Sequence, residues 1–370
     1  MKISKPNIVI KGDKSSIQFI FTEHLTPHIL WFKLPSKFLN KQQISSASLL
    51  SVFIPALTLG KKLTIDGKIS KKLFSNLETI IDIMMKWFPK KFVDPELDLE
   101  VDAVVQSRIR VNKNKKACFF TGGIDSMNTF LKHKDEIDYL IHVHKGIYLD
   151  TKDVNKFQNK EIENIRKFAK EFNVEVIEVS TNIRAFAMGK VNYTSQYHGS
   201  LFASIAILLS KDIGTFYFGS SHAYNGLTPY GSHPALDYLF EVEDMKFVHD
   251  GAEYTRIEKA KNISKFPEVF PYLHYGCEQE KCSKGQKCVR SMINLDLAGI
   301  RQQCPWANKH DYTADDIRNM GMAGYSDFSK AVENYKELKK HPDKRELMLA
   351  TKEIIDKFIK EKANKLIFKL

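Results

Sequence analysis

The pattern of apolar and polar residues changes near residue 110. Before that point, alternation in NIVIKG, SIQFIF and ILWFKL predicts short half-buried strands, and LTIDGKIS places a turn-like Asp66-Gly67 between extended pieces. A helix ending near Pro89 is predicted next, from apolar residues at helical spacing: Leu73, Leu77, Ile80, Ile81 and Met84. We therefore expect an N-terminal α+β domain over residues 1–110, without recognisable chemistry.

From about residue 115, strand-like and helix-like segments alternate. Four short apolar runs, ACFFT, IDYLIHVH, VEVIEVS and TFYFGSS, are separated by the helix-like stretches SMNTFLKH, VNKFQNKEIENIRKFAKEF and HGSLFASIAILLS. This order predicts an α/β domain with a parallel sheet over residues 111–310, followed by a helical C-terminal extension over 311–370. Because ligands of such sheets bind at the carboxyl ends of the strands, the polar motifs found there should share one site.

Composition and charge narrow the classes of function. The chain has 370 residues, of which 43% are hydrophobic, and 56 basic against 44 acidic residues give a net charge of +12. The lysines are spread along the whole chain, as is usual for solvated helix faces, so nucleic-acid binding is not expected. No apolar run is long enough for a membrane span, and the N-terminus lacks an apolar signal region, so we expect a cytoplasmic protein.

The strongest motif lies directly after the first apolar run of the α/β domain. Adjacent glycines, Gly122 and Gly123, allow the backbone to approach a phosphate closely. The hydroxyls of Thr121 and Ser126 add donors, and successive amides at a helix start form an anion-binding nest. The alternative is a simple Gly-Gly turn, but the preceding strand, the following helix and the Asp125-Ser126 pair favour a phosphate loop.

This segment, Thr121-Gly122-Gly123-Ile124-Asp125-Ser126, resembles the S-G-G-x-D-S loop of the PP-loop ATP pyrophosphatase superfamily, with Thr121 replacing the first serine. The resemblance implies the adenine nucleotide alpha hydrolase-like sheet of that superfamily. It also implies that residues 121–126 bind the pyrophosphate part of ATP, that Asp125 acts with Mg²⁺, and that ATP is cleaved to AMP and pyrophosphate. The P-loop pattern is excluded, because it requires a Gly-Lys-Ser/Thr end.

Within that superfamily, residues 115–300 are most similar to the 7-cyano-7-deazaguanine synthases. The segments FGSSHAY, YGSHP and LDY resemble their substrate loop, which follows the fourth strand, although a long surface loop is the alternative interpretation. The resemblance implies that Ser221 contacts the nucleotide and that His233 and Asp237 act on the substrate. In TRIEKA, Lys259 matches a lysine that faces the active site; the alternative is an exposed helical lysine.

Four of the five cysteines fall in one short segment, which in a reducing compartment favours metal over disulfides; Cys118 lies alone in an apolar run and is expected to be buried. The synthases hold a structural zinc on four cysteines, but here Gly285 replaces the third ligand. His274 or Cys304 could complete the shell, and Cys304 is favoured because thiolate matches the other ligands. The alternative is an eroded site with free thiols. The predicted Zn²⁺ ligands are Cys277, Cys282, Cys288 and Cys304.

Together these features predict an ATP-dependent ligase that adenylates a heterocyclic carboxylate. The resemblance implies 7-carboxy-7-deazaguanine as a candidate, and an amide, a nitrile or a conjugate with a protein partner as the product, since relatives of the synthases occur in anti-phage operons. Two alternatives remain open: an enzyme that thiolates tRNA, which needs a catalytic cysteine, and a non-catalytic nucleotide-sensing subunit of a defence complex. Self-association into a homodimer is also among the expected interactions.

Overall fold

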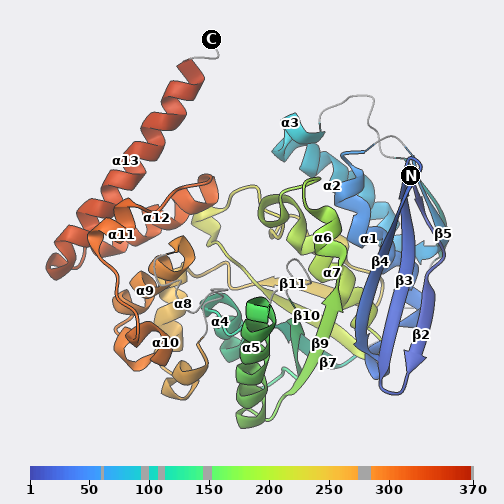
Figure 1. Cartoon of the computed structure of the whole chain (residues 1–370), viewed down its shortest axis with the longest axis horizontal. Helices are drawn as coiled ribbons and strands as arrows, with labels where there is room; N and C mark the ends of the chain where they lie inside the picture. Colours follow the sequence, from blue (N-terminus) through green and yellow to red (C-terminus); the bar gives the residue numbers. More distant parts are fainter. Residues whose placement is uncertain (60–61, 93–99, 107–112, 145–151, 274–284, 368–370) are drawn as a thin grey trace.

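One sheet runs through the whole fold. A computed structural model describes residues 1–59, 62–92, 100–106, 113–144, 152–273 and 285–367 (Figure 1). Within these residues an 11-stranded sheet has the order β11-β10-β7-β8-β9-β4-β3-β1-β5-β6, with β2 paired to β3. The strands are β1 (Lys2–Ile3), β2 (Asn7–Lys11), β3 (Lys14–Glu23), β4 (Thr26–Pro35), β5 (Lys62–Ser70), β6 (Glu100–Gln106), β7 (Lys115–Phe119), β8 (Tyr139–Val143), β9 (Glu175–Thr181), β10 (Ile213–Gly219) and β11 (Lys246–Asp250).

The half of the sheet built from residues 115–250 is parallel. Every neighbouring pair from β11 to β9 is parallel, and β7 lies between β10 and β8. The chain therefore builds β8 and β9 on one side of β7, and β10 and β11 on the other. The prediction of an α/β fold with a large, mostly parallel sheet is confirmed, and the PP-loop type within that class stays a prediction.

Helices cover both faces of this parallel half. On one face α1 (Ile44–Ala56) packs against α7 (His198–Leu209), and on the other lie α4 (Ile124–Lys132) and α5 (Lys152–Glu171). Residues of β7 alternate between the two cores: Ala117 and Phe119 face the first, whereas Cys118 faces the second. Cys118 is fully buried, as expected.

The C-terminal helices extend the second core. They begin with α8 (Arg256–Ile263) and α9 (Gln286–Leu297) and end with the projecting α13 (Arg345–Ile367), on the side of the molecule opposite the N-terminal strands (Figure 1). The others described are α2 (Lys71–Trp87), α3 (Pro89–Phe92), α6 (Ile183–Ala187), α10 (Pro305–Asn308), α11 (Ala314–Arg318) and α12 (Tyr325–Leu338). Among the helices described, none has the length and apolar character that crossing a membrane requires.

The N-terminal strands and the helix before Pro89 form as predicted, with two differences. In place of a turn, Asp66 and Gly67 lie inside β5, where its register against β6 shifts between Thr64 and Lys68. Pairing of β5 with both β1 and β6 keeps this segment extended, and a Cβ on Gly67 would lie 2.2 Å from the hydroxyl of Ser45. The second difference is α1, which was not predicted. Almost every residue in it is buried, so its sequence lacks the alternation of apolar and polar faces that marks a surface helix.

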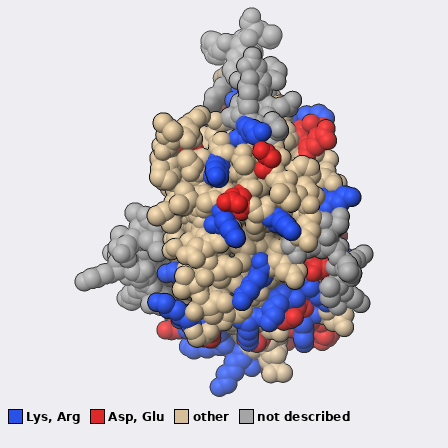
Figure 2. All heavy atoms as spheres, turned by 90° about the vertical axis from the view of Figure 1, so that its right-hand side faces the viewer, with Lys and Arg blue, Asp and Glu red and all other residues tan. Residues whose placement is uncertain are grey.

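The N-terminal strands continue the parallel sheet. Strand β4 pairs antiparallel with β9, in the register Phe32 with Thr181. The domain boundaries near residues 110 and 310 stay predictions. On the face that these strands present, Lys and Arg are densest toward the lower rim, where Asp and Glu are interspersed, and other charged side chains are scattered over the rest of the face (Figure 2).

The junction between β4 and β9 should contribute measurably to stability. Asn182 accepts a hydrogen bond from the backbone N–H of Trp31 at 2.9 Å and donates one to the carbonyl of Ile29 at 2.9 Å. Asn182→Ala removes both bonds and should lower the free energy of unfolding by about 1–3 kcal/mol in urea titrations. Asn7→Ala, an exposed change on β2, is the control. Equal stability of the two variants would show that the junction carries no such contribution.

Candidate functional site

The candidate site lies where β7 and β10 end side by side. The connections that follow these two neighbouring parallel strands run to opposite sides of the sheet. Such a switch point leaves a crevice at the carboxyl ends of the strands. A Cβ on Gly219, the last residue of β10, would lie 2.9 Å from the carbonyl oxygen of Asp125, so glycine is needed for the close approach of α4. Asp250, at the end of β11, accepts hydrogen bonds from Thr129 and Lys132 of α4, each at 2.9 Å. These contacts hold α4 against the ends of β10 and β11, with the start of the helix at the crevice.

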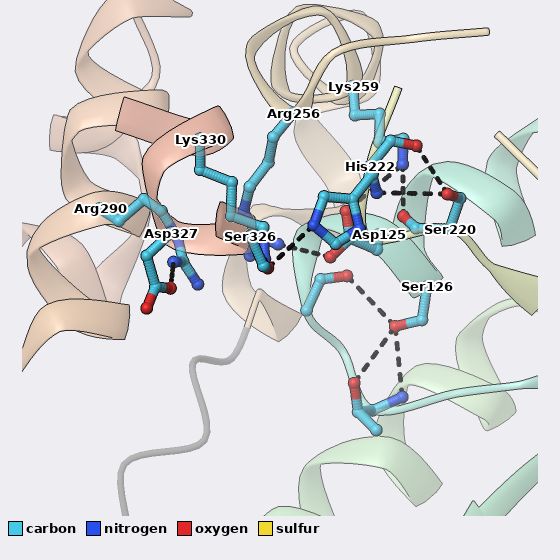
Figure 3. A network of polar contacts seen from close by, with 12 residues as sticks. Asp125, Ser126, Ser220, His222, Arg256, Lys259, Arg290, Ser326, Asp327 and Lys330 are labelled. Carbon is cyan, nitrogen blue, oxygen red and sulfur yellow. Dashed lines mark hydrogen bonds and ion pairs between the residues drawn. The ribbon is translucent and has the colours of Figure 1, made fainter. Parts of the chain in front are cut away.

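The loop between β7 and α4 has the features of an anion-binding nest. Gly122 has a φ of +70°, a left-handed conformation that favours glycine. The hydroxyl of Ser126 accepts from the backbone N–H of Thr121 at 3.2 Å and donates to the carbonyl of Gly123 at 3.2 Å (Figure 3). Gly123 is the N-cap of α4 and has no side chain to accept from the first helical N–H groups. These donors lie at the positive end of the helix dipole.

Asp125, in the first turn of α4, is held by two cations. Its Oδ2 accepts from Arg256 of α8, and its Oδ1 lies 3.5 Å from Nζ of Lys259 (Figure 3). Burial raises the pKa of this carboxyl, but the charges of Arg256, Lys259, Lys330 and others outweigh that effect and lower the pKa to about 2. Asp125 is therefore ionised throughout the physiological pH range.

Four basic side chains gather around this carboxylate from three helices. Arg256 and Lys259 come from α8, Arg290 from α9 and Lys330 from α12 (Figure 3). Lys259 is 1% exposed, Lys330 6% and Arg256 8%. Burial lowers the pKa of Lys259 and of Arg290, and with the neighbouring guanidinium groups it lowers the pKa of Lys330 to about 7. Desolvated cations of this kind are costly unless negative charge is brought to them.

Within the described residues, the ion pairs of these four cations use only two carboxylates, those of Asp125 and Asp327. The buried Nε–H groups of Arg256 and Arg290 have no acceptor among the described residues. Buried donors without partners are rare in folded proteins and mark places where a ligand or water is missing. The cluster of Arg256, Lys259, Arg290 and Lys330, called the cation cluster below, therefore has the capacity to bind an additional anion.

Several predicted site residues meet here. The structure brings residues 121–126 to Lys259, whose Nζ also donates to the carbonyl of Ser220 at 2.5 Å. Because Lys259 is buried against Asp125, the alternative of an exposed helical lysine does not hold. Ser221, predicted to contact the nucleotide, is half-buried on the loop after β10.

His222 was not predicted as a site residue. Its ring nitrogen Nε2 lies 2.9 Å from the hydroxyl of Ser326 on α12, and that hydroxyl also accepts from Lys330 at 3.0 Å. Burial, the charge of Lys330 and other neighbours lower the pKa of His222 to about 3, so its imidazole is neutral. The loop after β10 is thereby tied to the same helix that supplies Lys330.

The two other predicted catalytic residues lie in a separate network. Asp237 is 0% exposed; its Oδ2 accepts from Ser232 at 2.6 Å and lies 2.8 Å from Nδ1 of His249, and its Oδ1 accepts from the backbone N–H of His233 at 3.1 Å. The ring of His233 packs edge-on against Trp87. No hydrogen bond or ion pair joins either predicted residue to the 121–126 loop in the described part of the chain. The geometry makes Asp237 a residue that positions the loop after β10, which carries Ser232 and His233. Catalytic roles for Asp237 and His233 stay predictions.

Sequence reasoning missed most of the cation cluster. Arg256, Arg290 and Lys330 are lone basic residues in a chain with 56 of them, so no local pattern distinguished them. Arg256 had one usable signal, because it precedes Lys259 by three residues and therefore shares its helix face. The capping box of Thr255 and Glu258 fixes the start of that helix.

The predicted zinc ligands are only partly described. Cys277 and Cys282 lie outside the described residues. Cys288 is buried in the first turn of α9, and Cys304 is buried just before α10, where burial raises its pKa to about 12. Over the ranges that the structure describes, no group of three or more His, Cys, Asp or Glu side chains could hold a metal ion. A zinc site at these cysteines stays a prediction.

Comparisons with protein-family models, with curated proteins and with solved structures gave no match to this chain. The geometry of the site and the pattern of the loop are therefore the features that indicate its function.

Proposed function

We propose that the protein is an ATP-dependent ligase that adenylates a carboxylate and releases pyrophosphate. The observation that carries this proposal is the cation cluster around Asp125, beside the amide nest of residues 121–126. Three of its four side chains are at least nine-tenths buried, and its ion pairs in the described chain use only two carboxylates. A polyphosphate is the substrate class whose charge best matches such a site.

The chain's own residues would have distinct tasks in this reaction. The N–H groups at the start of α4 and the hydroxyls of Thr121 and Ser126 would hold the pyrophosphate portion of ATP. Lys259, fixed between Asp125 and the carbonyl of Ser220, would stabilise the charge that develops on the leaving pyrophosphate. Such positioning and charge stabilisation supply most of the acceleration in phosphoryl and nucleotidyl transfer.

Asp125 fits a Mg²⁺ ligand, because its low pKa keeps the carboxylate ionised and its Oδ1 is less tightly held than the oxygen bonded to Arg256. When bound, Mg²⁺ would neutralise charge on the phosphate oxygens and make phosphorus more electrophilic.

The bonds in the proposed reaction follow from the products. A carboxylate oxygen of the substrate attacks the α-phosphorus, and the bond to the β-phosphate oxygen breaks, so pyrophosphate leaves with the electron pair. A nitrogen nucleophile then displaces AMP from the acyl-adenylate. On the resemblance of the loop after β10, 7-carboxy-7-deazaguanine is the first carboxylate to test, with the half-buried His233 as a candidate contact to it.

Thiolation of tRNA is less well supported than ligation. Cys118, on the strand that leads into the loop, is 0% exposed, and burial raises the pKa of its thiol far above neutrality. A thiol in that state is a poor sulfur carrier. A purely nucleotide-sensing role would keep ATP binding without turnover, so a test of turnover separates it from the ligase.

The proposed reaction can be tested with one pair of variants. Incubation with ATP, Mg²⁺, 7-carboxy-7-deazaguanine and ammonium should yield AMP and pyrophosphate. Asp125→Asn keeps the size of the side chain but leaves the cation cluster without its central charge, and it should reduce AMP formation by about 100-fold or more. Chromatography of the nucleotides measures the products.

Asp135→Asn is the matched control, because Asp135 is exposed shortly after the end of α4. It should retain wild-type activity, and circular dichroism of both variants checks the fold. ADP and phosphate as the products would refute the proposal. AMP formation unaffected by Asp125→Asn would show that the reaction occurs elsewhere.

The charge of Lys330 should make anion binding depend on pH. Burial and the charges of Arg290 and Arg256 lower its pKa to about 7, although Asp125 and Asp327 oppose the shift. Below that pH the ammonium is charged, so pyrophosphate should bind more tightly to wild type than to Lys330→Met. Above it, binding must take up a proton and the advantage should shrink.

Titration calorimetry from about pH 6 to about pH 8, one unit on either side of this pKa, measures the effect. The ratio of the dissociation constant of Lys330→Met to that of wild type is compared at each pH, which cancels the protonation of pyrophosphate itself. A ratio that stays constant, or that rises with pH, would contradict the assigned role of Lys330.

A structural zinc on Cys277, Cys282, Cys288 and Cys304 is proposed from the cysteine pattern. Elemental analysis should find about one zinc per chain, because one tetrahedral site takes four such ligands. Cys288→Ser should lower both the zinc content and the melting temperature, whereas Cys118→Ser should leave the zinc content unchanged. Metal-free protein whose thiols all react would show that the site is eroded.

A further inference from the structure

A cavity of about 530 Å³ lies outside the cation cluster, between residues 225–228, the start of α8 and one face of α12. Part of its lining is apolar: Leu227, Ile257, Phe328 and Val332. The charged lining residues are Glu258, Glu333 and Glu337 together with Lys261, Lys336 and Lys340. Such a mixture suits a ligand with an aliphatic part and one charged end.

The carboxylates in this cavity differ in what they already bind. Glu337 pairs with Lys261 and with Lys340, the latter at 2.7 Å. Glu258 is used in the capping box of α8. Glu333 makes no ion pair within the described part of the chain, and the backbone N–H of Arg256 acts to lower its pKa. Of the three carboxylates that line the cavity, Glu333 is therefore the one available to pair with a cationic ligand.

Glu333 also connects the cavity to the cation cluster. Burial raises the pKa of Glu333, the charges of Lys259 and Lys330 lower it, and the charge of Asp125 raises it. Glu333 is therefore within electrostatic range of Lys259, Lys330 and Asp125. On α12, Lys330 belongs to the cation cluster and donates to Ser326, whereas Ser329 and Glu333 line the cavity. Lys330 and Glu333 are three residues apart on α12 and so are neighbours on its surface, which places the cavity next to the proposed reaction centre.

We infer that this cavity binds the nitrogen donor of the reaction, a primary amine on an aliphatic stem, with its ammonium group at Glu333. The inference rests on the proposed ligase function. Size argues against ammonia as the natural donor, because ammonia is close in size to water, which occupies only about 30 Å³ in the liquid. The apolar lining would hold the stem of a larger amine.

The second half-reaction forms an amide and releases AMP. The ammonium gives one proton to the carboxylate of Glu333, and the nitrogen lone pair forms a C–N bond with the carbonyl carbon of the acyl-adenylate. The C–O bond to AMP breaks, and AMP leaves with that electron pair. The second proton passes from nitrogen to solvent as the amide forms.

Binding of a probe tests this site without any turnover. The probe is Nα-acetyl-lysine N-methylamide, and Nα-acetyl-norleucine N-methylamide, which lacks only the amine, is the matched ligand. Ligand-observed NMR should show binding of the lysine probe alone. Glu333→Gln should weaken that binding by roughly tenfold or more, as expected for the loss of a hydrogen bond between charged groups. Glu346→Gln removes an exposed carboxylate of α13 that does not line the cavity, and it should have no effect.

Equal binding of both probes, absence of binding, or lysine-probe binding that Glu333→Gln leaves unchanged would each overturn the inference. These outcomes are independent of the proposed function, because ATP is not present in the measurement. A protein that forms AMP and pyrophosphate but fails the probe test would remain a ligase with its amine site elsewhere. A protein that binds the lysine probe at Glu333 but forms no AMP would refute the ligase and leave an amine-binding cavity.

Discussion

The ionised carboxylate of Asp125 is the centre around which α4, α8, α9 and α12 are arranged. It pairs directly with Arg256 and Lys259, and its charge also acts on Lys330 and Arg290. Without it, four largely buried cations would repel one another in a region of low dielectric constant. With it, their charge is only partly offset. The proposed anion site therefore combines stability in the folded protein with a remaining positive charge.

This balance explains why the helices after residue 255 belong to the candidate site. Lys330 and Ser326 reach the cluster from α12, and His222 contacts Ser326 from the loop after β10. The parallel sheet supplies the loop and the start of α4, whereas the C-terminal helices supply all four basic side chains of the cation cluster. The proposed amine cavity follows from the same arrangement, since α12 carries both Lys330 of the cluster and Glu333 of the cavity lining.

The second polar network has a different role. The carboxylate of Asp237 contacts Ser232 and His249 in the interior and accepts from the backbone N–H of His233, and this fixes the backbone that carries His233. A fully buried carboxylate with partners on both oxygens is a means of holding a loop in one shape. The half-buried His233, not Asp237, is then the side chain that remains able to meet a ligand.

The sequence by itself determined the strands and helices with a regular pattern and the phosphate-loop motif. Local effects decide these features, because alternation, helical spacing and the conformational freedom of Gly122 act within a few residues. Only the tertiary structure decided which of many basic residues meet Asp125. Arg290 and Lys330 lie more than a hundred residues from it in the chain, and nothing in their local sequence distinguishes them from solvated lysines and arginines. Their burial comes from the packing of α9 and α12 beside α8, and burial is what turns an ordinary positive charge into part of a binding site.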